Sequence, residues 1–402
     1  MSIQTEIDRI ITAVGAAYDA VEAKGGTAPA AQTIEGLAGA ISGIKSAPAT
    51  PYMDAEYVAV EDGGITNHYI KSAKLYNHTA VYAYEFFGQY NLNSLDFGDA
   101  SNNITTIETN AFSGANLAGI VLPDTIASLQ GACFANAIIA TLELPAQITE
   151  IPQSAFVGIS AADEELPINI ILPPNLTKIG ESAFSSAAIP QISIPNTVTE
   201  IGENAFQYCF GLTSFVIPPL LQKIPQCMLQ GCENITAITI PAAVTEIGAN
   251  AFENTGITSI TIPATITTLG MNMLRGCVNL ATINIQANVT EIPDRFAQES
   301  GRTSVTLPDT VETIGSEAFS SSRAKLTEIT IPASVTSIGD YAFMQNESMT
   351  TITCLAATPP TLGRNAFAMD TINTTIKVPA ASVAAYKAAA GWNIWADIIV
   401  AM

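Results

Sequence analysis

The stretch Ile192–Phe206, ISIPNTVTEIGENAF, returns almost unchanged as Ile238–Phe252, ITIPAAVTEIGANAF. Close copies occupy Val305–Phe319 and Ile329–Phe343. Weaker copies lie at Leu142–Phe156, Ile170–Phe184, Phe215–Leu229 and Ile260–Leu274. A phrase that repeats at a short, nearly fixed period indicates a solenoid in which each copy builds one coil.

Each copy closes on Phe or Leu, and these closing residues serve as anchors for counting the coils. The anchors are Phe86, Phe112, Phe134, Phe156, Phe184, Phe206, Leu229, Phe252, Leu274, Phe296, Phe319, Phe343 and Phe367. Most are 22 to 24 residues apart, and an insertion around residues 160–167 lengthens the gap before Phe184. This period is too short for paired helices, so the sequence predicts about thirteen small coils.

Within one coil, the Ile-x-Ile alternation predicts a short strand with both Ile facing the core and the middle residue facing outwards. The next residue is Pro, which has no N–H to donate and ends the strand. Val-Thr-x-Ile predicts a second strand, and the segment before the anchor predicts a tight turn or short helix. The expected fold class is therefore an α/β solenoid with parallel ladders that rise about 4.8 Å per coil.

These phrases resemble the BspA-type leucine-rich repeat family over about Ala80–Thr371. The resemblance implies a right-handed leucine-rich repeat coil. It also implies a surface-exposed or secreted protein that adheres to host proteins or to other cells. The chain shows neither a signal peptide nor a wall anchor, so a protein acting outside the cell would leave by a non-classical route.

Composition excludes several function classes. The 402 residues carry a net charge of −21, so partners that need basic patches, such as nucleic acid, are not expected. No apolar run is long enough to insert in a membrane. The pair His68 and His78 has no neighbouring ligand at metal spacing, and no nucleophile elbow, phosphate loop or catalytic carboxylate pair stands out. We therefore expect no enzymatic activity, no metal and no cofactor.

Residues 1–47 predict a helical module separate from the repeats. Its apolar seam is spaced 4, 3, 4, 3, 4 and consists of Ile3, Ile7, Ile10, Val14, Ala17 and Val21. One interpretation is a helical hairpin that packs on itself or on the first coil. The other is a docking or oligomerisation module, for which Ile at both seam positions favours three strands.

The segment from Ala17 to Ile44 is also similar to a helical segment of phage and prophage tail-associated proteins. That resemblance implies a virion protein, such as a tail fibre, receptor-binding or decoration protein, assembled in the host cytoplasm. Residues 1–47 would then contact other virion proteins. The alternatives are a bacterial adhesin at the cell surface and a purely structural spacer.

Residues 48–79 predict a linker and an aromatic N-terminal cap, and most tyrosines of the chain lie in or just after it. These are Tyr52, Tyr57, Tyr69, Tyr76, Tyr82, Tyr84 and Tyr90. Tyrosine offers large, stiff contact area with a polar tip, so the cluster predicts either a cap that closes the first coil or a binding surface. The partner would be a protein or a cell-surface glycan.

Other repeat positions favour structural roles. Cys209, Cys232 and Cys277 lie three residues after their anchors, where other copies hold Ala or Thr, which indicates buried thiols. Cys209 and Cys232 fall in adjacent coils, close enough in principle for a disulfide, so the sequence leaves open whether they are bridged. Charges alternate along the column Glu150, Lys178, Glu200, Lys223, Glu246, which we interpret as a device that fixes coil register. Residues 372–402 predict a C-terminal cap sealed by Trp392 and Trp395, with a helix over Ser382–Ala390.

Overall fold

The computed structural model describes residues 55–59, 70–75, 78–92, 94–98, 103–162, 167–321, 326–367 and 374–402. By its contacts the chain divides into two units, Met1–Asp54 and Ala55–Met402. The predicted module 1–47, with its seam from Ile3 to Val21, therefore lies outside the described residues.

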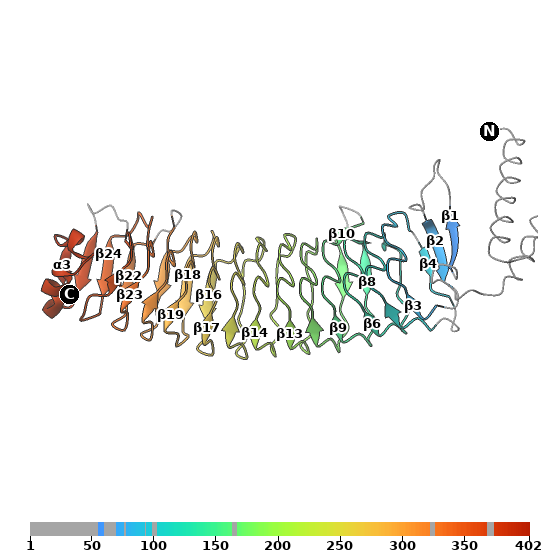
Figure 1. Cartoon of the computed structure of the whole chain (residues 1–402), viewed down its shortest axis with the longest axis horizontal. Helices are drawn as coiled ribbons and strands as arrows, with labels where there is room; N and C mark the ends of the chain where they lie inside the picture. Colours follow the sequence, from blue (N-terminus) through green and yellow to red (C-terminus); the bar gives the residue numbers. More distant parts are fainter. Residues whose placement is uncertain are drawn as a thin grey trace, which may run out of the picture. The chain divides into compact units, whose positions relative to one another are not determined.

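The second unit is a stack of small β-coils, each named here by its anchor (Figure 1). One face carries the Ile-x-Ile strands, here called the first-strand face. Its strands are β2 (Ile70–Leu75), β4 (Ser94–Asp96), β7 (Ile138–Ile139), β8 (Thr141–Glu143), β10 (Ser160–Ala161), β11 (Asn169–Ile171), β16 (Ser259–Ile262), β18 (Thr282–Ile285), β20 (Ser304–Thr306), β22 (Glu328–Ile331), β24 (Thr351–Cys354) and β26 (Thr375–Val378).

The Val-Thr-x-Ile segments form the second-strand face. Its strands are β3 (Ala80–Val81), β5 (Thr106–Ile107), β6 (Ser128–Leu129), β9 (Glu150–Ile151), β12 (Lys178–Ile179), β13 (Glu200–Ile201), β14 (Lys223–Ile224), β15 (Glu246–Ile247), β17 (Thr268–Leu269), β19 (Glu291–Ile292), β21 (Thr313–Ile314), β23 (Ser337–Ile338) and β25 (Thr361–Leu362). Pairing between coils is parallel and in register, as in Lys178 opposite Glu200 and Ile179 opposite Ile201. The predicted solenoid of about thirteen coils is confirmed, and it is built of β-strands.

Three prolines interrupt the second-strand ladder. It is divided into β3-β5-β6, β9-β12-β13, β14-β15-β17 and β19-β21-β23-β25. In coils with Gly after the second-strand Ile, that N–H donates to the preceding coil, as from Gly202 to the Ile179 carbonyl at 2.8 Å. The coils that begin a new segment carry Pro152, Pro225 and Pro293 at this position, and proline has no N–H to donate.

The anchor segment is a turn, not a helix. In every coil a residue before the anchor adopts positive φ, and Asn often fills it, as at Asn110 and Asn204. Asn tolerates this conformation better than most residues, whereas a helix cannot include it. The expected α/β class is therefore wrong for the described residues, in which α3 (Val383–Ala388) is the single α-helix beside the short 3₁₀ helices η2 (Ala380–Ser382) and η3 (Asn393–Trp395).

Buried anchor rings stack from coil to coil along the core. Phe134 and Phe156 lie parallel at 5.1 Å between ring centroids, and Phe184 and Phe206 at 5.2 Å. Phe296 is displaced by one position: the Ala297 N–H donates to Ala318, the contact that an anchor makes elsewhere, and Phe296 meets Phe319 edge-on. The assignment of Phe296 as an anchor is therefore wrong, and Ala297 fills that place.

Each end of the described solenoid departs from the repeat. At the first coil, β1 (Ala55–Ala59) pairs antiparallel with β2. At the other end, β27 (Ile399–Ala401) adds to β26, and Trp392 and Trp395 are buried against Phe367. Ser382 precedes α3 as predicted, but its hydroxyl donates to the Ala357 carbonyl at 2.7 Å and does not cap the helix.

Candidate functional site

Three aromatic side chains project from the turn of the Phe86 coil. Tyr84, Phe87 and Tyr90 are 53%, 51% and 54% exposed, whereas Phe86, the anchor of the same turn, is fully buried. The rings of Tyr84 and Phe87 lie 5.7 Å apart between centroids. We call Tyr84, Phe87 and Tyr90 the first-coil aromatic patch.

A rigid polar framework holds this patch in place. Beneath it, the buried His78 Nε2 lies 3.0 Å from Glu85 Oε1, and the other oxygen of Glu85 accepts the Tyr82 N–H at 2.9 Å. Glu108 of the next coil accepts the Ala83 N–H at 3.0 Å. Because these bonds fix the start of the turn, the exposed rings are presented on a preorganised backbone.

The tyrosines predicted as a surface are only partly brought together. Tyr82 is half-buried, with its ring 5.3 Å from that of His78, while Tyr84 and Tyr90 are exposed. Tyr57 lies in β1, and Tyr52, Tyr69 and Tyr76 fall outside the described residues, as does His68. Sequence reasoning missed Phe87 and Glu85; Phe87 was overlooked because it directly follows the anchor Phe86.

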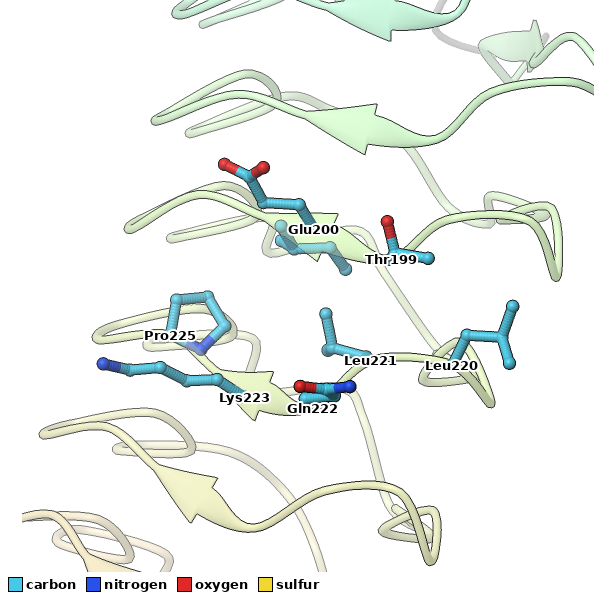
Figure 2. Close-up of a pocket in the computed structure, with 8 residues that line it drawn as sticks. Thr199, Glu200, Leu220, Leu221, Gln222, Lys223 and Pro225 are labelled. Atoms are coloured by element: carbon cyan, nitrogen blue, oxygen red, sulfur yellow. The ribbon is translucent and has the colours of Figure 1, made fainter.

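A second exposed apolar region lies at the junction between the Phe206 and Leu229 coils. A groove of about 390 Å³ opens there on the second-strand face, with Glu200 on one coil and Lys223 and Pro225 on the next (Figure 2). Leu220 lines it and is exposed, and the exposed rings of Tyr208 and Phe210 stack on the turn side of the same junction. This groove coincides with the ladder interruption at Pro225.

The alternating charge column is divided at this groove. Lys178 Nζ lies 3.3 Å from Glu150 and 3.4 Å from Glu200, and these carboxylates raise the lysine pKa through hydrogen bonding and charge. Lys223 pairs with Glu246 at 3.4 Å. Among the ion pairs of the described residues, none joins Glu200 to Lys223, so the predicted five-rung column is wrong at this rung.

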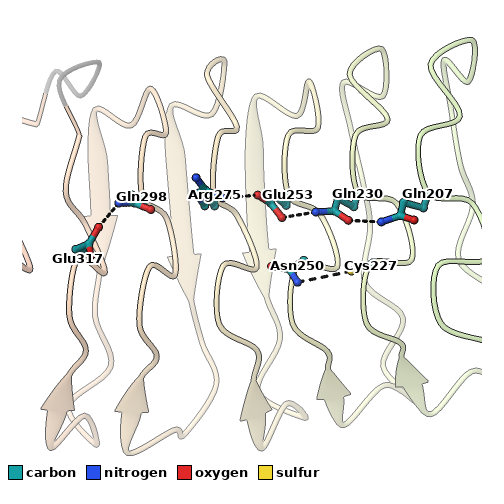
Figure 3. Close-up of polar contacts among 8 residues, drawn as sticks. All are labelled: Gln207, Cys227, Gln230, Asn250, Glu253, Arg275, Gln298 and Glu317. Carbon is teal, nitrogen blue, oxygen red and sulfur yellow. Dashed lines mark hydrogen bonds and ion pairs between the residues drawn. The ribbon is translucent and has the colours of Figure 1, made fainter.

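A row of polar side chains crosses the turns of the middle coils (Figure 3). Gln207 donates to Gln230, Gln230 donates to the buried Glu253 at 2.5 Å, and Arg275 donates to Glu253 at 2.9 Å. Farther along, Gln298 donates to Glu317. Each carboxylate finds its donors within the row, so the arrangement links coils and offers no free catalytic pair.

The commonest residue at the outward positions of the first-strand face is Thr, as at Thr261, Thr306 and Thr330. β-branched apolar residues replace them at Val121, Ile171 and Val216, all exposed. This side of the solenoid is therefore a hydroxyl-rich sheet surface without an aromatic row.

All six cysteines are free and buried, as predicted for the repeat slot. Burial raises the pKa of the Cys277 thiol to about 11, and the thiol contacts the Thr255 hydroxyl at 3.3 Å. The described residues contain no cluster of three or more side chains suited to a metal ion, nor any helix of the length and apolarity that a membrane span requires.

These features define a short-period β-solenoid whose exposed chemistry is aromatic and hydroxyl-bearing. The family model of the BspA type leucine rich repeat region matches residues 79–213, 166–281, 199–324 and 268–389. The chain belongs to this family.

Solved structures with similar coils come from several bacteria. A leucine-rich repeat protein from Bacteroides ovatus shares 20% identity over 87% of this chain and 98% of its own, with a TM-score of 0.49. A leucine-rich cell surface protein from Faecalibacterium prausnitzii shares 20% identity over 76% and 95%, with a TM-score of 0.38. The search of curated proteins found no match.

Proposed function

We propose that the solenoid is a non-enzymatic binding module for adhesion, and that the first-coil aromatic patch is its main contact. The observation that carries the proposal is the exposure of Tyr84, Phe87 and Tyr90 together on one turn. Large rings left in water forgo burial energy, at about 25 cal/mol per Å² of apolar surface. A group of them on a fixed backbone is typical of a surface that a partner covers.

The chemistry of the patch fits a protein partner. Tyrosines and other aromatic rings carry much of the energy at protein interfaces because they bury large area at low entropic cost. The patch backbone is already held by Glu85 and Glu108, so little ordering is needed on binding. Family membership supports the same role, an adhesin at the bacterial surface or outside the cell that contacts host proteins or other cells.

The test measures binding of the full chain to whole bacterial cells and to immobilised extracellular-matrix proteins. The triple variant Tyr84→Ser/Phe87→Ser/Tyr90→Ser should lose at least tenfold in affinity, about 1.4 kcal/mol. Val121→Ser, which removes an 82% exposed apolar side chain from the first-strand face, is the matched control and should bind normally. Equal binding by the triple variant and the control would place the contact elsewhere.

A second candidate is a phage virion protein that uses the solenoid for host recognition. It rests on the sequence of residues 1–47 alone, because the described coils suit either role. The two candidates differ in what residues 1–47 assemble with, so solution mass separates them. A glycan partner is distinguished from a protein by pretreating the cells with protease.

A further inference from the structure

The junction between the Phe206 and Leu229 coils has the fewest backbone bonds on its strand faces. On the second-strand face, Pro225 leaves β13 and β14 unpaired. On the first-strand face, residues 189–194 and 212–217 form no strand, and the Thr213 N–H donating to the Pro190 carbonyl at 3.1 Å is the backbone bond between them. The turn side remains bonded, as from Tyr208 to Gln230 at 2.7 Å.

Cys209 and Cys232 lie on that bonded turn side, one coil apart. The Cys209 thiol donates to the Phe184 carbonyl at 3.0 Å, and the Cys232 thiol donates to the Phe206 carbonyl at 3.2 Å. The two contacts are the same contact shifted by one coil. Because parallel chains stack about 4.8 Å apart, equivalent residues of neighbouring coils fall within the roughly 4.4–6.8 Å between Cα atoms that a disulfide spans.

This pairing is particular to the two cysteines among the described slots. The third cysteine of the repeat slot, Cys277, makes the same contact with the Phe252 carbonyl at 3.2 Å, but its neighbour in the preceding coil is Thr255. The neighbouring Cys232 thiol, together with burial, raises the pKa of Cys209 well above its ordinary value. Both thiols are fully buried, so in the folded chain they react slowly with outside reagents.

We propose that Cys209 and Cys232 form a disulfide between coils when the chain folds in an oxidising compartment. The oxidant is a disulfide of the thiol-exchange class, such as oxidised glutathione. The Cys209 thiol loses its proton and attacks one sulfur, and the first glutathione leaves as a thiolate. The Cys232 thiolate then attacks the Cys209 sulfur and expels the second, so one disulfide is reduced as one forms.

This disulfide would link the two coils covalently on the turn side of the junction. It closes a loop of one repeat, which restricts the unfolded chain and raises the unfolding temperature. It forms during coiling or during opening of the junction, when both thiols meet solvent. Disulfides persist outside the cell and are rare in a reducing cytoplasm, so the presence of this disulfide in the native protein would distinguish the two locations.

The experiment refolds the full chain with oxidised and reduced glutathione or with excess reductant, then unfolds it and alkylates the free thiols. With oxidant, four of the six thiols should react, and digestion should give one peptide that links Cys209 to Cys232. The oxidised chain should melt higher by roughly 5 °C or more. Hydrogen exchange of residues 212–231 should slow at least tenfold.

Two variants separate this disulfide from general oxidation of the cysteines. Cys209→Thr copies the Thr255–Cys277 arrangement, in which Thr lies on the preceding coil, and should abolish the linked peptide and the melting shift, while Cys277→Thr should leave both unchanged. Alkylation of all six thiols after oxidative refolding of the native chain would overturn the proposal. Glutathione retained on Cys209 without closure would overturn it equally. Neither result depends on whether the aromatic patch binds a partner.

Discussion

At the residue scale, Arg302 breaks the repeat most sharply. It fills the slot that holds Leu280 in the preceding coil and Met349 farther on, and it is fully buried. Its guanidinium donates to the carbonyls of Ala297 and Phe319 and to Asn346 Oδ1, and its Nε has no partner. It has no ion pair among the described residues, so the slot contains a buried cation held by neutral oxygens.

Removing only an acceptor of this buried cation should destabilise the fold more than removing the cation and the acceptor together. Asn346→Ala takes away an acceptor 3.0 Å from a buried charge and should lower the unfolding free energy by about 1.5–3 kcal/mol. The double variant Arg302→Met/Asn346→Ala restores an ordinary apolar slot and should be neutral or stabilising by about 1–4 kcal/mol. Urea unfolding checks this order, and a double variant weaker than the single would contradict it.

The same side chain predicts a pH dependence. Burial lowers the pKa of Arg302 to about 9 from its ordinary 12.5. Because the fold disfavours the charged form, burial of Arg302 lowers the unfolding free energy, and this loss is largest below about pH 9. The loss shrinks as pH rises towards 12.5, since the folded chain then holds Arg302 neutral while the unfolded chain still protonates it. The stability gap between the double variant and the native chain should therefore narrow from pH 7 to pH 10.5 in paired urea titrations. A widening gap would refute the assignment.

Residue chemistry also limits what the sequence can predict of the site. The cluster of tyrosines was visible, but which rings face water depends on the turn around Phe86, which has positive φ at Tyr84 and Gly88. Arg302 and Glu85 gave no signal, because a charged residue in a repeat reads as solvent-exposed unless the copies are aligned position by position. Aligned with Leu280, Arg302 would have been recognisable as buried.

At the element scale, the coils stack through backbone, and that contact accounts for the glycine after the second-strand Ile. A Cβ at Gly202 would lie 2.4 Å from the Glu181 nitrogen, and one at Gly180 would lie 2.7 Å from the Gln153 nitrogen. These neighbours are main-chain atoms and cannot move aside without separating the coils. At Gly180 and Gly202 the glycine is therefore required by packing.

Gly202→Ala should accordingly lower the unfolding free energy by roughly 1–3 kcal/mol through overpacking. Gln130→Ala is the matched control, since Gln130 occupies the equivalent place and donates its N–H to the Ile107 carbonyl at 2.9 Å. That control should stay within about 0.5 kcal/mol. Thermal unfolding compares them, and equal losses would show that the close approach is relaxed.

The repeat phrase predicted the two strands, the proline stop and the buried anchors, because alternation and spacing alone determine them. It did not predict where the ladder is interrupted, although the cause is visible in the sequence at Pro152, Pro225 and Pro293. The Phe296 error has a related origin: IPDRFA is one residue shorter before its Phe than IGENAF. A count of aromatic residues therefore assigned the anchor to Phe296, whereas an alignment on the second strand places it at Ala297.

At the scale of the whole molecule, the coils from β2 to β27 are one unit with a continuous apolar core. Their ends are covered differently: β1 pairs antiparallel at the start, and the tryptophans seal the finish. Repeat arrays need such caps because terminal coils would otherwise expose their apolar faces. A solenoid capped in this way needs no second copy to cover its ends.

We predict that the seam of residues 1–47 sets the assembly state. Three helices that bury Ile7, Ile10 and Val14 would give a trimer, as Ile at both seam positions favours. Light scattering on the full chain should then give three times 42.0 kDa. Ile7→Glu/Val14→Glu should return the monomer mass, because a carboxylate in the seam cannot be buried unpaired. Exposed Thr261→Glu is the control and should stay trimeric. A monomeric native chain would remove the oligomerisation role, leave residues 1–47 as a hairpin or a dock for another protein, and weaken the virion hypothesis relative to the adhesin.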